Sequence, residues 1–192
     1  MSSENPSASV TAPAHKASFT TPEEDRMIEA AFKEVLDGYL ASNHRKKVEI
    51  IERAYRFAKE AHSGIRRRSG EPYILHPIAV AKIASQEIGL GSTSICAALL
   101  HDVVEDTDYT FDDLLRLGVP DNIVDALRLL THAPQDEYTD YVRRIATSGN
   151  PIAIAVKLND LHHNLQRGRK MGYHRLVAKH EGALAIMNSV SP

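Results

Sequence analysis

The chain has 192 residues, of which 43% are hydrophobic and 25% charged, and this length and composition suit one globular domain with a buried core. Its net charge of −2 argues against a protein that binds nucleic acid or a membrane surface through a broad basic face. A single cysteine excludes a disulfide framework and a thiolate metal cluster, and no stretch reaches the roughly 18 apolar residues of a membrane span.

The first 20 residues are rich in serine, alanine, threonine and proline, and they lack the apolar region of a secretion signal. We therefore expect residues 1–20 to form a disordered tail and residues 21–190 to form one domain. The cytoplasm is the expected location, and nothing in the pattern indicates an oligomeric state.

Apolar residues recur at the spacing of helices, and no segment shows the alternation of a strand, so the sequence predicts an all-α domain of about eight helices. Capping residues, prolines and glycines mark the expected helix ends. The expected elements are a helix from the capping box at Thr21 and Glu24, a helix over 46–62, a helix from His76-Pro77 to Gly89 and Gly91, a helix capped by Ser92, a helix from the capping box at Thr110 and Asp113, and helices over 121–132, 137–149, 151–169 and 173–190.

The stretch "LLHDVVEDT", residues 99–107, places His101, Asp102, Glu105 and Asp106 directly after an apolar run. Residues three or four apart share one face of a helix, so a helix that continued through this stretch would gather the four side chains into one cluster. Carboxylates near the C-terminal end of a helix repel one another and the helix dipole, and a bound metal ion would relieve that repulsion.

Three further features support a site of this kind. His76 precedes Pro77, and Asp160 lies on an otherwise apolar helix, where a carboxylate is costly unless it is paired or binds a metal. The run Arg66-Arg67-Arg68-Ser69 has the chemistry of a phosphate clamp. The alternatives are a histidine at a helix start, a salt bridge between Asp160 and an arginine, and a solvated basic turn.

Together, His76, His101, Asp102 and Asp160 would form a site with two histidines and two carboxylates. Nitrogen and oxygen ligands without a thiolate suit Mn²⁺, Fe²⁺, Co²⁺ or Mg²⁺, and they leave Zn²⁺ open. Five further histidines are expected to be structural or to lie on the surface: His62, His162, His163, His174 and His180. His163 is the least certain of them because it lies three residues from Asp160.

Three segments carry a resemblance to a known family: "AKEAHSGIRRRSGEPYILHPIAVAKI", "AALLHDVVEDTDYTFDDLLRLG" and "AVKLNDLHHNL". Over residues 50–167 the chain resembles the hydrolase domain of the RelA/SpoT family, part of the HD superfamily of metal-dependent phosphohydrolases. The resemblance implies a stand-alone small hydrolase, because the chain ends where longer members begin their synthetase domain. It also implies an all-α fold, one Mn²⁺, and hydrolysis of ppGpp or pppGpp to GDP or GTP and pyrophosphate.

Position by position, the resemblance implies metal ligation by His76, His101, Asp102 and Asp160. It implies acid–base roles for Glu105 and Asp106, without deciding which is the acid. It implies nucleotide contacts for Arg67, Arg68, Ser69 and Asn164.

The chain departs from the family pattern at several positions. Leu161 stands where an arginine is common, Arg167 where a threonine is common, and Ile65 where a glutamine is common. The segment "IVDALRLLTH" also differs from the family's "LVDGVTKL". These changes bear on nucleotide preference more than on hydrolysis. The alternatives are therefore an HD phosphohydrolase for another nucleotide or NADPH, a non-catalytic alarmone sensor, and a purely structural helical protein.

Overall fold

The structure is a computed structural model that describes residues 19–42, 47–86 and 91–190. Within these residues the chain is all-α, as predicted, with ten helices, no strand, and an isolated bridge between Arg66 and Pro72. None of the described helices combines the length and apolar character needed to cross a membrane. The helices are α1 (Pro22–Ala41), α2 (Val48–Ala61), α3 (Leu75–Gln86), α4 (Gly91–Leu100), α5 (Val103–Asp106), α6 (Phe111–Arg116), α7 (Asp121–Leu130), α8 (Tyr138–Ala146), α9 (Pro151–Lys170) and α10 (His174–Val190).

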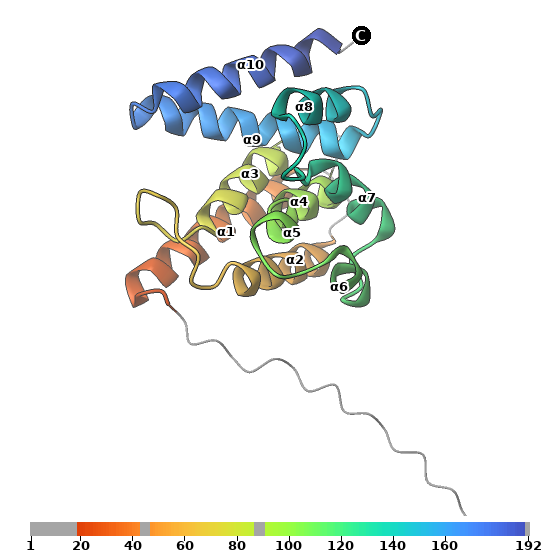
Figure 1. The fold of residues 1–192 in the computed structure, drawn as a ribbon. Coiled ribbons are helices and arrows are strands. Elements are labelled where there is room, and N and C mark those ends of the chain that lie inside the picture. The colour runs from red at the N-terminus through yellow and green to blue at the C-terminus, as the bar shows by residue number, and fades with distance from the viewer. Residues whose placement is uncertain (1–18, 43–46, 87–90, 191–192) are drawn as a thin grey trace, which may run out of the picture.

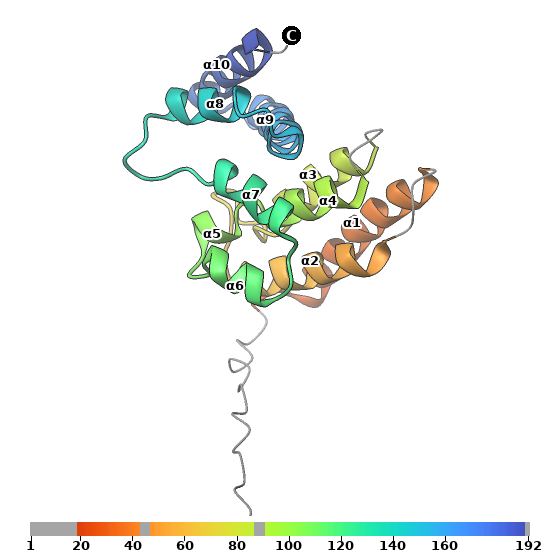
Figure 2. The ribbon, with the colours of Figure 1, turned by 90° about the vertical axis from the view of Figure 1, so that its right-hand side faces the viewer.

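The helices pack in layers on both sides of a central pair, an arrangement that is clearest in Figures 1 and 2. Helices α3 and α4 pack against each other and form the centre of the molecule. On one side, α1 packs on α3 and α2 packs on α4, while on the other side α9 packs on α3, α4 and α7. Helix α10 packs on α8 and α9 as the outer layer. The central pair is therefore enclosed by helices from both ends of the chain.

Helix α4 is the most deeply buried element of the fold. Its residues from Ser94 to Leu100 are all buried, and none of them is charged. A helix that is apolar all round is stable only when neighbours cover every face, and here α2, α3, α7 and α9 do so. The chain reaches His101 directly from this rigid helix, which fixes the position of the polar residues that follow.

Several predicted helix starts are confirmed by hydrogen bonds. The Thr21 and Thr110 hydroxyls each accept a hydrogen bond from the backbone N–H three residues on. In turn, the side chains of Glu24 and Asp113 accept from the backbone N–H groups of Thr21 and Thr110. At the start of α9, the Asn150 side chain accepts from two backbone N–H groups. These residues satisfy N–H groups that the first turn of a helix leaves without partners.

Other boundaries differ from the expectation or lie outside the described residues. Helix α4 already begins at Gly91, so Ser92 lies inside its first turn and the prediction of a Ser92 cap is wrong. Gly89, residue 46 and residues 1–18 are not among the described residues, so the glycine stop, the start at 46 and the disordered tail stay predictions. The short helix α5 is the one described helix that has no counterpart among the expected elements.

No single helix runs through residues 101–106, so the condition under which one helix face would gather the four polar side chains is not met. Helix α4 ends at Leu100, His101 and Asp102 form a turn, and α5 begins at Val103. His101 Nδ1 donates to the carbonyl oxygen of Ala98 at 2.7 Å. A continuous helix would use that carbonyl to accept from the N–H of Asp102, so the histidine side chain competes with the helix at this point.

Candidate metal and substrate site

His76, His101 and Asp102 lie together at the junction of α3 with the end of α4. One ligand atom from each lies within 4.8 Å of the others. Asp102 Oδ2 is 3.4 Å from His76 Nε2, and Asp102 Oδ1 is 3.2 Å from His101 Nε2. The structure therefore brings together three of the four predicted metal-binding residues, with His76 lying 25 residues before the adjacent His101 and Asp102 in sequence.

Asp160 joins this cluster from α9. Its Oδ1 atom is 3.2 Å from His76 Nε2 and 3.9 Å from His101 Nε2. Its Oδ2 atom accepts a hydrogen bond from Lys157 at 3.1 Å, and Asn164 Nδ2 donates to Oδ1 at 2.5 Å. The charged partner of Asp160 is therefore this lysine rather than the arginine considered from the sequence.

The electrostatics keep both carboxyl groups of the cluster ionised. Burial opposes ionisation of Asp160, but Lys157, His76 and His101 outweigh it and hold the pKa of this carboxyl well below its ordinary value. Burial likewise opposes ionisation of Asp102, yet His101 and His76 lower its pKa. The cluster thus presents two carboxylates and two imidazole nitrogens at one point.

The donor atoms fit a divalent metal ion. His101 Nδ1 is engaged by Ala98, while His101 Nε2 is buried and has no hydrogen-bond partner among the described residues. A buried nitrogen without a partner costs free energy, and this nitrogen faces the carboxylates of Asp102 and Asp160. Two imidazoles and two carboxylates without sulfur suit first-row divalent metals and Mg²⁺. The residues therefore form a possible His/Asp metal site.

Sequence reasoning missed two residues that hold this cluster. The Tyr73 hydroxyl donates to Asp102 Oδ2 at 2.7 Å, and its ring stacks on His62 with centroids 5.1 Å apart. Lys157 is buried beside Asp160 and lies 5.0 Å from the ring centre of Tyr141. The lysine could have been found, because a residue three positions before Asp160 shares its helix face. No local signal marked Tyr73.

Glu105 and Asp106 lie on α5 at the edge of the cluster, and both are exposed. Glu105 Oε2 accepts from the backbone N–H of His132 at 2.9 Å, which ties α5 to the end of α7. Partial shielding from water, together with Asp102 and Asp106, raises the pKa of Glu105 above its ordinary value. Burial and the carboxylates of Asp102 and Asp106 also raise the pKa of Tyr73, so Asp106 lies close to this tyrosine.

The predicted nucleotide loop lies between α2 and α3 and reaches the C-terminal half of α9. Arg67 is half-buried, and its Nη2 donates to Asn164 Oδ1 at 3.0 Å, so these two residues meet beside Asp160. Burial, followed by the charge of Arg167, lowers the pKa of Arg67. The loop is thus held against the helix that carries one carboxylate of the cluster.

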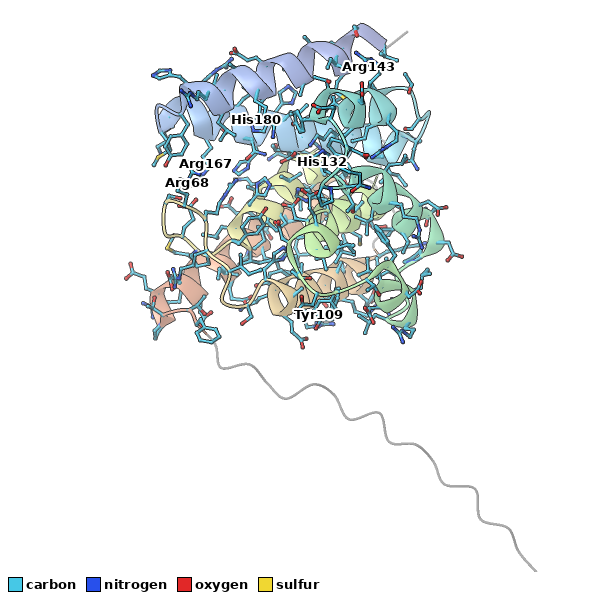
Figure 3. All side chains as sticks on the ribbon, in the orientation of Figure 1. Arg68, Tyr109, His132, Arg143, Arg167 and His180 are labelled. Carbon is cyan, nitrogen blue, oxygen red and sulfur yellow. The ribbon has the colours of Figure 1, made fainter. Side chains whose placement is uncertain are left out.

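Arg167 makes a second connection between the loop and α9. Its guanidinium donates to Ser69 Oγ and to Glu71 Oε1, the latter at 2.7 Å, and Ser69 Oγ in turn donates to Glu71 at 2.6 Å. Arg68 is exposed and, among the described residues, pairs with no other side chain. Figure 3 shows Arg68 and Arg167 at the same edge of the molecule, between the loop and α9.

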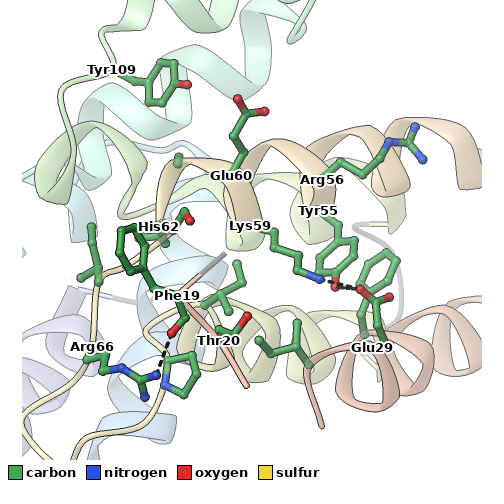
Figure 4. A pocket seen from close by; sticks show the side chains of 18 of the residues that line it. Phe19, Thr20, Glu29, Tyr55, Arg56, Lys59, Glu60, His62, Arg66 and Tyr109 are labelled. Atoms are coloured by element: carbon green, nitrogen blue, oxygen red, sulfur yellow. Dashed lines mark hydrogen bonds and ion pairs between the residues drawn. The ribbon is translucent and has the colours of Figure 1, made fainter. Parts of the chain in front are cut away.

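A cavity of about 720 Å³ lies on a different side of the loop, between α1, α2 and residues 62–66 (Figure 4). Lys59 donates to Glu29 there, and Arg66 donates to the backbone carbonyl of Phe19. None of the four cluster residues His76, His101, Asp102 and Asp160 lines this cavity. The cavity is therefore separate from the cluster.

Comparison with known proteins adds to this geometry. The chain is 39% identical over 127 residues to a guanosine-3′,5′-bis(diphosphate) 3′-pyrophosphohydrolase of Aquifex aeolicus, which covers 63% of this chain and 18% of that protein. It is 42% identical over 87 residues to the bifunctional (p)ppGpp synthase/hydrolase SpoT of Escherichia coli, which covers 45% of this chain and 12% of that protein. The chain therefore spans less than a fifth of the length of these relatives.

A solved structure and a family model also match. The structure is reported as a metazoan ortholog of SpoT that hydrolyzes ppGpp, and it superimposes with a TM-score of 0.54 at 26% sequence identity over 78% of this chain and 96% of the other. The model of the HD domain matches residues 54–180, which include every residue of the cluster. The match covers more than half of the chain, and the chain accordingly belongs to the HD domain family, with a domain of the RelA/SpoT kind.

Proposed function

We propose that this protein is a metal-dependent pyrophosphohydrolase that removes the 3′-pyrophosphate from ppGpp or pppGpp and releases GDP or GTP. The meeting of His76, His101, Asp102 and Asp160 at one buried point, with His101 Nε2 left unpaired, carries the proposal. The names of the relatives and of the solved structure support the substrate class. Because the chain spans only part of the length of those relatives, ppGpp and pppGpp are proposed as its substrates.

The four residues of the cluster would hold the metal ion, and Mn²⁺ is our choice among the divalent ions. His76 and His101 offer Nε2, and Asp102 and Asp160 offer carboxylate oxygens. When bound, such an ion supplies a Lewis acid that lowers the pKa of water toward neutrality.

Glu105 and Asp106 would manage the protons of the reaction. Hydrolysis forms a bond from a water oxygen to the phosphorus on the ribose 3′ oxygen and breaks the bond to that 3′ oxygen. The water loses a proton, and the leaving 3′ oxygen gains one. A carboxyl group with a raised pKa keeps a proton closer to neutral pH, which favours Glu105 as the proton donor. Asp106 would then orient the water and accept its proton.

Arg67, Arg68, Ser69 and Asn164 would bind the nucleotide. Arg68 is exposed at the edge of the molecule between the loop and α9, where a guanidinium can pair with phosphate oxygens. Arg67 and Asn164 already contact each other beside Asp160, so they lie next to the reacting phosphate in this arrangement. The Ser69 hydroxyl would contact the nucleotide only after a change in its bonds to Glu71 and Arg167.

The test is an assay of pyrophosphate release from ppGpp and pppGpp by the full chain, with Mn²⁺ and with EDTA. We expect release that depends on the metal and GDP or GTP as the second product. Cleavage of another nucleotide or of NADPH, with ppGpp left intact, would instead identify an HD phosphohydrolase of different specificity. Tight binding of ppGpp without release would identify a sensor.

A further inference from the structure

His163, on α9, contacts the Nδ1 atom of His76, whereas the Nε2 atom of His76 faces Asp102 and Asp160. The Nδ1 atoms of the two histidines are 2.8 Å apart, a hydrogen-bond distance, and the rings stack with centroids 5.0 Å apart at 26°. His76 is buried and His163 is half-buried. This contact joins the first turn of α3 to α9 across 87 positions of the sequence.

The position of the proton in this contact follows from the other nitrogen of His76. His76 Nε2 faces the carboxylates of Asp102 and Asp160, so this nitrogen must carry a lone pair if His76 is to bind a metal. The ring proton then lies on Nδ1, which must donate. The partner Nδ1 of His163 must therefore accept, and the proton of His163 lies on its own Nε2.

We propose that His163 is a positioning residue whose Nδ1 accepts a proton from His76 and thereby holds His76 with Nε2 free toward the metal. The inference rests on the proposed function, because that proposal makes His76 a ligand. Metal-binding histidines usually donate their outer N–H to a fixed acceptor, which sets both the tautomer and the orientation of the ring. In this chain a second imidazole has that place.

The other ligand histidine is held in a comparable way by a different kind of acceptor. His101 Nδ1 contacts the carbonyl oxygen of Ala98, which belongs to the rigid helix α4. His76 lies in the first turn of α3, and its Nδ1 meets the side chain of His163 rather than a backbone carbonyl. The orientation of His76 therefore depends on a side chain that mutation can replace.

Three replacements of His163 separate the role of its acceptor from simple packing. Asparagine places Oδ1 at the same number of bonds from Cα as Nδ1 of histidine, so H163N retains an acceptor there. Glutamine carries the same amide one bond further out, so H163Q displaces the acceptor, and H163L removes it. The neighbouring His162 is exposed, and H162L serves as the matched control.

Two measurements on the full chain test the proposal. Titration calorimetry with Mn²⁺ gives the affinity, and ¹⁵N NMR of the metal-free protein identifies the tautomer of His76. We expect H163L and H163Q to bind Mn²⁺ about 10-fold to 100-fold more weakly than wild type, and H163N and H162L to bind within about threefold of it. We expect the Nδ1–H tautomer of His76 in wild type and H163N, and a mixture of tautomers in H163L.

The proposal is overturned if H163L binds Mn²⁺ like wild type, if H163N is as weak as H163L, or if His76 in the wild type carries its proton on Nε2. These outcomes differ from failure of the proposed function. A wild-type protein that binds Mn²⁺ but releases no pyrophosphate from ppGpp contradicts the function and leaves the role of His163 in place.

Discussion

Lys157 Nζ lies 3.1 Å from Asp160 Oδ2, and both side chains are buried on helix α9. Tyr138 and Tyr141 enclose the ammonium group, with ring centres 5.7 and 5.0 Å away. Burial alone would lower the pKa of Lys157, but Asp160 and the two tyrosines raise it, so the lysine is charged. This pair supplies the positive charge that allows Asp160 to be a buried carboxylate.

The first prediction concerns this pair. Lys157→Met keeps most of the side-chain volume but leaves Asp160 buried without its cation, so we expect a loss of about 3–5 kcal/mol in the free energy of unfolding. Urea unfolding in EDTA measures it. Lys33→Met is the control, because the Lys33–Asp37 pair is exposed and should lose less than about 1 kcal/mol. Equal losses in the two variants would contradict the assigned role.

The second prediction concerns metal binding. Asp102→Asn removes the charge that faces both histidines, and His101→Ala removes the unpaired Nε2, so both variants should lose measurable Mn²⁺ binding and hydrolysis. Titration calorimetry measures the binding, and circular dichroism checks that the helices remain. The exposed His162→Ala serves as control. Binding at wild-type affinity in His101→Ala would remove this residue from the site.

The third prediction separates proton transfer from metal binding. Glu105→Gln should retain the metal affinity and lower kcat by about 10²-fold to 10⁴-fold, because an amide cannot donate a carboxyl proton. The assay is pyrophosphate release at saturating ppGpp, compared with Asp108→Asn, an exposed acid nearby. Normal turnover in Glu105→Gln would show that its assigned role is wrong.

The fourth prediction concerns the ion pair between Glu71 and Arg167, which ties the loop to α9. Arg167→Glu or Glu71→Arg should release the loop and raise KM for ppGpp about 10-fold, with no change in Mn²⁺ affinity. Steady-state kinetics of the single variants and of the double charge swap test this. The double variant should recover part of the loss, and additive losses would mean that the pair does not position the loop.

The fifth prediction concerns pH. The hydrogen bond from Arg66, followed by that from the Thr21 N–H, lowers the pKa of Glu24 from 4.5 to about 2. Because the folded state has the lower pKa, the stabilisation is complete above the unfolded pKa of 4.5 and is lost as pH falls from 4.5 toward 2. Arg66→Met should therefore reduce the dependence of unfolding free energy on pH in this range. Urea unfolding at several pH values measures it, and unchanged dependence would argue against this contact in solution.

The sequence by itself was sufficient for features that depend on a few neighbouring residues. The capping boxes at Thr21 and Thr110 and the cap at Asn150 set helix starts locally, and the helical period of apolar residues set the fold class. Spacing and residue type also identified His76, His101, Asp102 and Asp160, which the structure brings to one point.

Other features depended on the packing of distant segments, and only the tertiary structure decided them. The turn at His101 arises where its ring donates a hydrogen bond to the carbonyl of Ala98, near the end of the buried helix α4. Helical periodicity does not indicate that a side chain will replace a backbone N–H as the donor to this carbonyl. Tyr73 meets Asp102, and His163 meets His76, only because α3 and α4 pack together beneath α9. A sequence pattern can therefore predict which side chains are chemically active. The residues that orient those side chains are determined by how the helices pack against one another.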